Sequence, residues 1–122
     1  MRDFVHIRDV VTACRLACDD DSAAGRAINI GSGRTYTVLD IADRMAKVLG
    51  SSLRAEVTRK YRTGDIRHCT ADIGLARRLL GFEPAVDLEQ GLADLARWLS
   101  TQEAVDRCDE MRAQLTERGL AR

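Results

Sequence analysis

Apolar residues recur every three or four positions in several stretches of this 122-residue chain, and short apolar runs lie between them. The clearest helical stretch runs from Thr37 to Leu49, where this spacing brings the apolar side chains onto one face. Thr37 and Asp40 have the spacing of a helix capping pair, and Gly50 is typical of a helix end. We expect a helix whose buried stripe consists of Val38, Ile41, Ala42, Met45 and Leu49.

The same criteria predict two further helices, each introduced by an aspartate that can act as an N-cap. One begins at Asp9 and ends near Asp20, and the other begins at Asp72 and ends at Gly81. The first is expected to bury one face, made of Val10, Ala13, Cys14, Ala17 and Cys18.

The C-terminal part of the chain also has helical patterns. Asp87 introduces a helix that extends to about Leu99 and buries Leu88, Leu92, Leu95 and Leu99. Residues 102–119 are helical by composition, but their apolar stripe is thin and suits contact with one other helix better than a core position. That stripe consists of Val105, Cys108, Met111 and Leu115.

Short runs between these helices are expected to be extended. The runs at residues 4–7, 27–30 and 53–58 predict strands, and a short extended piece is expected at 67–70. Strands that alternate with helices indicate an α/β fold, with α+β as the nearest alternative.

Length and charge limit the classes of function. A chain of this size holds one domain, which we place at residues 1–100, followed by a helical tail at 101–122. Its 19 basic and 19 acidic residues balance, so no charge excess favours nucleic acid or an anionic membrane as a partner. No apolar run approaches the roughly 20 residues of a membrane span, and residues 1–20 lack the apolar centre of a signal peptide. We therefore expect a soluble, cytoplasmic protein.

Four cysteines, Cys14, Cys18, Cys69 and Cys108, form no C-x-x-C pair and no regular framework. The ligand spacing of a structural zinc site is absent, so we expect no metal and interpret the cysteines as buried free thiols in a reducing compartment. The aspartates at residues 19–21 do not fit the calcium-loop pattern and are expected to lie in a solvated loop.

A Gly-Ser-Gly sequence at residues 31–33 follows an apolar run and precedes a helix, as in the turn that binds the pyrophosphate of a dinucleotide. That turn requires a third small residue three positions later, where this chain has Tyr36. The simpler interpretation is a strand-to-helix turn that needs glycine for its backbone conformation.

A second candidate is the basic loop at residues 59–68, which combines five cationic or imidazole side chains with Asp65 around Gly64. Arginine suits a phosphate or carboxylate, and a neighbouring aspartate can accept hydrogen bonds from sugar hydroxyls. From spacing alone, a solvated run of charges is the favoured interpretation. No serine lies in a nucleophile-elbow sequence, so no catalytic triad is indicated.

Four blocks follow one another along the chain: RDFVHIRDVVTA, AINIGSGRTYTVLDIADRMAKVLG, RTGDIRHCTADIGLARRLLGFEP and DLEQGLADLARWL. In that order they resemble the C-terminal part of the extended short-chain dehydrogenase/reductase family, the NAD-dependent nucleotide-sugar epimerases and dehydratases. The resemblance covers about residues 2–99 and implies the substrate-binding lobe of that fold. Nothing beyond residue 100 is recognised.

The resemblance also implies roles for individual residues. Arg2 matches the arginine of the R-D-[FWY]-[VIL]-H block and Arg62 that of the R-x-G-D block, and both contact the diphosphate of the nucleotide sugar in the family. Asp65 matches the aspartate that contacts the nucleotide ribose. Asn29 and Arg67 are further candidate substrate contacts, although turn geometry explains Asn29 equally well.

In the family, a G-x-x-G-x-x-G turn binds NAD and a Tyr-x-x-x-Lys pair performs catalysis. This chain has neither, because its lysines Lys47 and Lys60 follow Asp43 and Glu56 at that spacing. We therefore expect no catalytic residue and no NAD binding by this chain alone. Two interpretations follow: the nucleotide-sugar-binding portion of a UDP- or dTDP-sugar enzyme, or a standalone, non-catalytic binding or assembly module. A purely structural remnant is a third, weaker alternative. Its expected partner is a second copy, in a homodimer, or a separate Rossmann-lobe chain.

Overall fold

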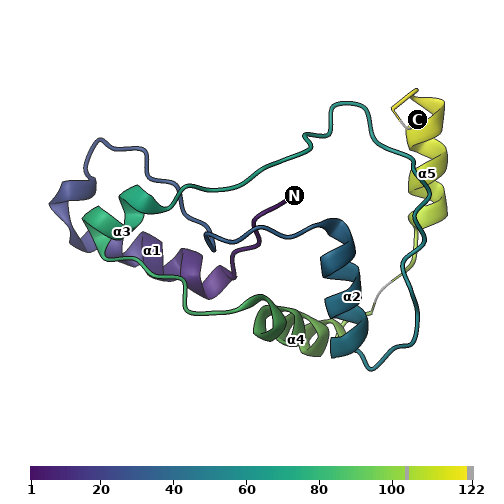
Figure 1. Cartoon of the computed structure of the whole chain (residues 1–122), viewed down its shortest axis with the longest axis horizontal. Coiled ribbons are helices and arrows are strands. Elements are labelled where there is room, and N and C mark those ends of the chain that lie inside the picture. The colour runs from purple at the N-terminus through teal and green to yellow at the C-terminus, as the bar shows by residue number, and fades with distance from the viewer. Residues whose placement is uncertain (104, 121–122) are drawn as a thin grey trace.

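The computed structural model describes residues 1–103 and 105–120, and its regular elements are helices. In chain order these are α1 (Ile7–Asp19), the 3-10 helix η1 (Asp21–Ala23), α2 (Val38–Val48), α3 (Gly74–Leu80), α4 (Leu88–Leu99) and α5 (Cys108–Glu117). Figure 1 shows α1, η1 and α3 together at one end, α2 against α4 in the middle, and α5 apart from both groups. None of these helices is long and apolar enough to cross a membrane.

The core lies between α1 and α3 and is made of Ala13, Ala76, Leu80 and Phe82. Ala13 and Ala76 are small enough to let the two helices approach closely, and Phe82, which is 0% exposed, fills the space beyond the end of α3. Half-buried side chains of η1 and of the segment after it, Ala23, Ile28 and Ile30, pack around this cluster. The predicted helices at 9–20 and 72–81 therefore supply most of the packed interior.

The strands predicted at 4–7, 27–30 and 53–58 are wrong. Within residues 1–103 and 105–120, extended pairing is limited to two isolated bridges, Arg2 to Tyr36 and Arg2 to Cys69. A strand is held by the hydrogen-bond ladder of a neighbouring strand, and among the described residues these runs have no such neighbour. The α/β expectation therefore gives way to an all-helical set of elements, although Cys69 falls in the extended piece predicted at 67–70.

Two predicted helix starts are confirmed. Thr37 and Asp40 form a reciprocal capping box at α2, because each side chain accepts a hydrogen bond from the other residue's backbone N–H. Asp87 caps α4 by accepting from the backbone N–H of Gln90 at 2.8 Å. Gly81, with φ 60°, ends α3 as expected.

The other two predicted N-caps are wrong. His6 caps α1, because its side chain accepts from the backbone N–H of Arg8, and Asp9 lies inside the first turn with only 4% of its surface exposed. Asp72 lies one residue before the N-cap position of α3, which Ile73 occupies, and its side chain accepts from the backbone N–H of Gly74 at 2.8 Å. Both aspartate side chains accept hydrogen bonds from backbone N–H groups, but neither residue occupies the N-cap position that the spacing indicates.

The buried-thiol interpretation is also wrong, because all four cysteines are free and exposed. Helix α1 packs on α3 through Ala13 and the half-buried Leu16 and Ala17, so Cys14 and Cys18 lie outside the contact. Among the described residues, no group of three or more His, Cys, Asp or Glu side chains is arranged to hold a metal ion.

Helices α2 and α4 pack on each other but bury little. Ile41, Ala42 and Met45 are half-buried as the stripe predicts, whereas Val38 and Leu49 at its ends are exposed. Of the leucines expected in the core from α4, Leu92 is buried, while Leu95 and Leu99 are exposed. An ion pair between Arg44 and Glu89 joins the two helices. Both helices have an apolar face as predicted, but each face is only partly buried.

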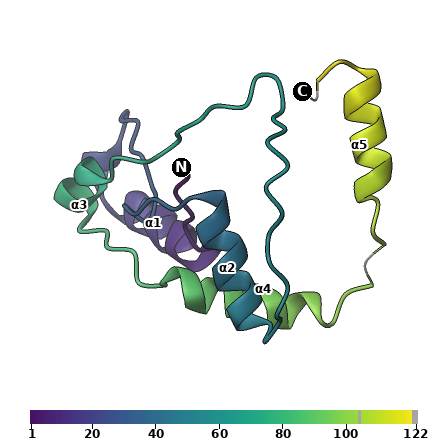
Figure 2. The ribbon, with the colours of Figure 1, turned by 45° about the vertical axis from the view of Figure 1, so that its right-hand side comes forward.

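The C-terminal tail forms a shorter helix than the one predicted over 102–119. Figure 2 shows α5 standing beside the long extended segment that follows α2. In the part of the chain that the structure describes, α5 packs against none of the other helices. The backbone N–H of Thr63 donates to the carbonyl of Leu120 at 2.8 Å, which anchors the end of the tail to the basic loop. The predicted apolar stripe is therefore not buried.

Candidate functional site

Three segments that are far apart in the sequence meet at the N-terminus. The backbones of Arg2 and Tyr36 exchange two hydrogen bonds, each 2.9 Å long. On the other side, the N–H of Asp3 donates to the carbonyl of Cys69, and the N–H of Cys69 donates to the carbonyl of Met1, both at 3.0 Å. Arg2 is therefore held by its backbone between residues 36 and 69.

The Gly-Ser-Gly turn holds a carboxylate of the chain itself. Asp3 accepts hydrogen bonds from the backbone N–H and the hydroxyl of Ser32, at 2.8 and 2.7 Å, and from the backbone N–H of Gly33 at 3.1 Å. A Cβ at Gly31 would lie 2.6 Å from both the Asp3 carboxylate and the Ala71 side chain, so glycine is required there. The turn therefore serves the local structure, and two of its N–H groups are occupied by Asp3.

The side chain of Arg2 contains a buried nitrogen, Nη1, that has no hydrogen-bond partner. Burying an unpaired donor on a charged group is unfavourable, so such atoms are rare in folded proteins and often mark a site that a ligand or ion completes. This atom lies on the first of the three residues predicted to bind substrate.

The other two predicted contacts, Arg62 and Asp65, face each other across the turn at Gly64. The Nη2 atom of Arg62 lies 3.5 Å from Oδ2 of Asp65, and both side chains are more than half exposed. An exposed pair at this distance is weak and leaves both groups available to a ligand. Among the described contacts, no hydrogen bond or ion pair connects this pair to Arg2.

The two further candidates lie near the N-terminal junction. Asn29 is exposed and lines a surface hollow of about 330 Å³ together with Asp3, Gly31 and Cys69. Arg67 takes part through its backbone, because its carbonyl accepts from the N-terminal ammonium group at 2.7 Å. The structure therefore brings Asn29 and the Arg67 backbone close to the segment that carries Arg2. Arg62 and Asp65 precede Arg67 in the basic loop and lie farther from that segment.

A larger groove of about 480 Å³ runs between residues 4–8 and α4. It is mainly apolar, and its lining includes Phe4, Leu88, Leu92, Leu95 and Trp98. The helical spacing predicts core positions for these leucines, and Leu92 is indeed buried. The spacing alone cannot show that the face around it stays open as a groove.

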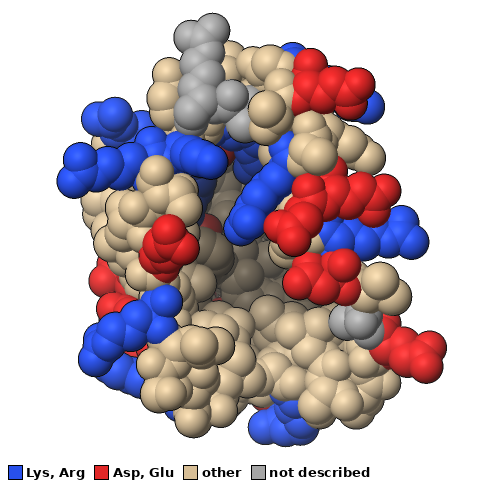
Figure 3. Space-filling model, turned by 90° about the vertical axis from the view of Figure 1, so that its right-hand side faces the viewer, with Lys and Arg blue, Asp and Glu red and all other residues tan. Residues whose placement is uncertain are grey.

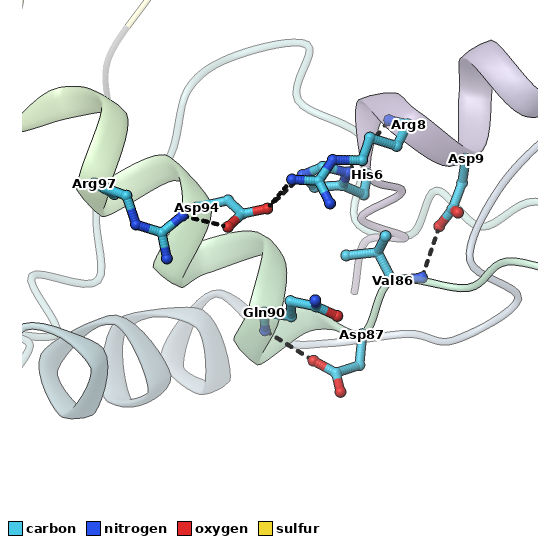
Figure 4. Close-up of polar contacts among 8 residues, drawn as sticks. All are labelled: His6, Arg8, Asp9, Val86, Asp87, Gln90, Asp94 and Arg97. Carbon is cyan, nitrogen blue, oxygen red and sulfur yellow. Dashed lines mark hydrogen bonds and ion pairs between the residues drawn. The ribbon is translucent and has the colours of Figure 1, made fainter.

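Polar residues at the edge of this groove, shown in Figure 4, tie α1 to α4. Arg8 donates to Asp94 at 2.7 Å, and Arg97 donates to the other oxygen of the same carboxylate at 3.0 Å. The Asp9 carboxylate points to the segment before α4 and accepts from the backbone N–H groups of Ala85 and Val86 at 3.1 and 3.2 Å. None of these roles was predicted from the sequence.

The lowered carboxyl pKa values of the chain belong to turns and helix starts. Hydrogen bonds from the backbone and then the side chain of Thr37 lower the pKa of Asp40, and bonds from Ser22 lower that of Asp20. In the tail, the neighbouring Asp106 raises the pKa of the Cys108 thiol. These shifts have structural causes and do not indicate an acid–base pair.

Basic and acidic side chains are unevenly distributed over the end of the molecule that carries α5. Figure 3 shows a central hollow at this end, with several Lys and Arg side chains on its upper left and most of the Asp and Glu side chains on its right. In the basic loop, Arg59, Lys60 and Arg62 are exposed. A negatively charged ligand would be attracted to the basic side of this surface.

Comparison with known proteins identifies the family. The sequence profile of the GDP-mannose 4,6 dehydratase family matches residues 1–95, which is most of the chain. The chain belongs to this family. Curated relatives include the dTDP-L-rhamnose 4-epimerase of Burkholderia thailandensis, which is 33% identical over 101 residues, and the UDP-glucose 4-epimerase of Bacillus subtilis, which is 34% identical over 103. Each alignment spans 83% of this chain but only 28% and 30% of the respective relative.

Solved structures of the same family have a matching arrangement of elements. The UDP-glucose 4-epimerase of Bifidobacterium longum, in complex with NAD+ and UDP, aligns with a TM-score of 0.73 at 25% identity. A point mutant of the UDP-glucuronic acid 4-epimerase of Bacillus cereus, in complex with a fluorinated UDP-sugar and NAD, aligns with a TM-score of 0.68 at 29% identity. These alignments cover 82% and 80% of this chain and 30% and 32% of the epimerase chains. The family profile stops before α5, so the family match does not extend to the tail.

Proposed function

We propose that this chain forms the nucleotide-sugar-binding portion of an NAD-dependent epimerase or dehydratase that acts on a UDP- or dTDP-sugar. The observation that carries the proposal is the buried, unpaired Nη1 atom of Arg2, at the position that matches a diphosphate-binding arginine of the family. The relatives support the substrate class, since their names specify UDP- and dTDP-sugars and the solved epimerases contain NAD with UDP or a UDP-sugar.

In this proposal the two arginines bind the diphosphate. Arg2 supplies a buried donor, and Arg62 supplies an exposed guanidinium that can turn from Asp65 to the ligand. Asp65 then becomes free to accept hydrogen bonds from the ribose hydroxyls. Asn29 and Arg67 lie at the edge of the ligand, and NAD binds to the dinucleotide-binding lobe of the family fold.

Calorimetric measurement of the affinity of the 122-residue chain for UDP tests this assignment. Because a charge-assisted hydrogen bond is worth roughly 1.5–3 kcal/mol, Arg2→Ala and Arg62→Ala should each weaken UDP affinity about 10- to 100-fold. Arg15→Ala, on the exposed side of α1, is the matched control and should leave the affinity unchanged. Equal affinities for the wild type, Arg2→Ala and Arg62→Ala would overturn the site.

The chain by itself is expected to be catalytically silent, because proton transfer needs a positioned tyrosine and lysine that its sequence does not contain at the family spacing. NAD-dependent turnover of a UDP- or dTDP-sugar by the purified chain would contradict this expectation.

The second candidate function is a non-catalytic binding or assembly module, which the exposed apolar faces of α2 and α4 favour. Mixing the chain with the separately produced dinucleotide-binding lobe of a relative distinguishes the two functions. Restored epimerase or dehydratase turnover supports the enzyme portion, whereas complex formation without turnover supports the module.

A further inference from the structure

The side chain of Asp3 links the N-terminal segment to the Gly-Ser-Gly turn. Its carboxylate is half-buried and accepts all three hydrogen bonds from residues 32 and 33. The backbone of the same residue donates to the carbonyl of Cys69. Asp3 therefore contacts both segments between which Arg2 is held.

Arg2 and Asp3 contact the 32–36 loop at different points. Arg2 pairs with Tyr36 through its backbone, and Asp3 binds Ser32 and Gly33 through its side chain. Two neighbouring residues thus hold the loop at points four residues apart. Fixing both points determines where the Cα of Arg2 lies and from which direction its side chain leaves the backbone.

We propose that Asp3 is a positioning residue that aims the Arg2 guanidinium at the nucleotide diphosphate, an inference that rests on the proposed function. An arginine side chain loses considerable rotamer freedom when it binds, so a fixed starting point for that side chain improves affinity without a further contact. Asp3 acts through Arg2 and touches no ligand.

Removing the negative charge of Asp3 distinguishes positioning from simple electrostatics. A carboxylate next to the binding arginine repels a diphosphate, so Coulomb's law alone predicts that Asp3→Asn tightens UDP binding. Positioning predicts the opposite sign, because asparagine places an amide group, which is a donor, against one of the N–H groups of Ser32 and Gly33. We expect UDP affinity to fall about tenfold.

A double-mutant cycle separates positioning from general loss of structure. If Asp3 acts through Arg2, Asp3→Asn should lower affinity about tenfold in the wild type and less than about twofold when Arg2 is already alanine. The matched control is Asp9→Asn, because Asp9 likewise accepts from two backbone N–H groups but binds Ala85 and Val86. Its effect on UDP affinity should be below about twofold in both backgrounds.

Ser32→Ala provides a milder second variant that keeps all backbone N–H groups. It removes the 2.7 Å hydroxyl contact to Asp3 and should weaken UDP binding about threefold. If Asp3→Asn does not fold, this variant decides the proposal through the same cycle with Arg2→Ala. Tighter binding by Asp3→Asn, or equal losses with and without Arg2, would overturn the proposal.

Amide hydrogen exchange tests the positioning without any ligand. The N–H groups of Arg2 and Tyr36 bond to each other's carbonyls, so both should exchange several times faster in Asp3→Asn, while those in α3 remain unchanged. If the wild type binds no UDP but exchange accelerates as expected, the proposed function fails and the anchoring of Arg2 by Asp3 stands. Unchanged exchange at Arg2 and Tyr36 would refute the role of Asp3 whatever the outcome with UDP.

Discussion

Helices α1 and α3 form a closed contact, whereas α2 and α4, whose apolar faces are only partly covered, form an open one. At the first contact Ala13 is 1% exposed and Phe82 is fully buried, while Trp98 on α4 is 58% exposed. The first pair joins through small residues and is covered by η1 and the segment after it. In the part of the chain that the structure describes, no other helix packs against the second pair. An apolar stripe therefore predicts that a helix has an inner face, but a covering element decides whether that face is buried.

The comparison is tested most strongly by removing one aromatic side chain from each region. Phe82→Ala leaves a cavity in the closed contact and should lower the free energy of unfolding by about 3–5 kcal/mol. Trp98→Ala removes a mostly exposed ring and should lower it by less than about 1 kcal/mol. Urea denaturation followed by circular dichroism measures both values. Equal losses would show that the Trp98 ring is buried in solution.

The second test concerns the carboxylate that connects the two regions. Asp9→Asn replaces one of two backbone-bound oxygens with a donor and should lower the free energy of unfolding by about 1–3 kcal/mol. The control Asp109→Asn changes a carboxylate in α5 that is 97% exposed, and its effect should be negligible. Thermal unfolding of both variants checks this prediction, which fails if the two curves coincide.

The third test asks whether the apolar stripe of the tail is buried against a second copy of the chain. Met111 on α5 is 51% exposed, and the predicted apolar stripe of the tail suits a seam between two helices. We expect a two-fold dimer with α5 at or near the contact, because closed two-fold pairs are the commonest assemblies. Sedimentation should show that Met111→Asp weakens the dimer while Gln114→Asp does not. A folded wild-type monomer at micromolar concentration would rule the dimer out.

The smallest effect is expected at the capping box of α2. Thr37→Ala removes the side-chain hydrogen bond to Asp40, so the pKa of Asp40 should rise towards its ordinary value of about 3.9. Because the folded-state pKa is lowered, the contribution of Asp40 to stability is present above that ordinary value and is lost as the pH falls through the lowered one. Titration of the Asp40 carboxyl by NMR measures the shift, with Asp20 as the unchanged reference. A pKa of Asp40 that does not respond to Thr37→Ala would contradict the capping box.

Whether the sequence indicated a contact depended on how far apart the two residues lie along the chain. The reciprocal bonds of Thr37 and Asp40 and the cap at Asp87 lie within one helical turn, so the sequence pattern contains all the information they need. The partner of Asp9 lies 76 and 77 residues away, at Ala85 and Val86, and no local pattern could indicate it. The predicted site divides in the same way. Arg62 and Asp65 are neighbours in sequence and meet in the structure, whereas the buried nitrogen of Arg2 could be found only in the folded chain.

The sequence by itself determined the places of the helices, several of their ends and the family resemblance, because these depend on neighbours within a few residues or on ordered blocks of residues. Only the tertiary structure decided that the predicted strands lack partners, that the cysteines are exposed and that the Gly-Ser-Gly turn binds Asp3. The physical reason is the same in each case. Strand pairing, burial and the occupation of backbone N–H groups are relations between distant segments, and the position of those segments is fixed by packing.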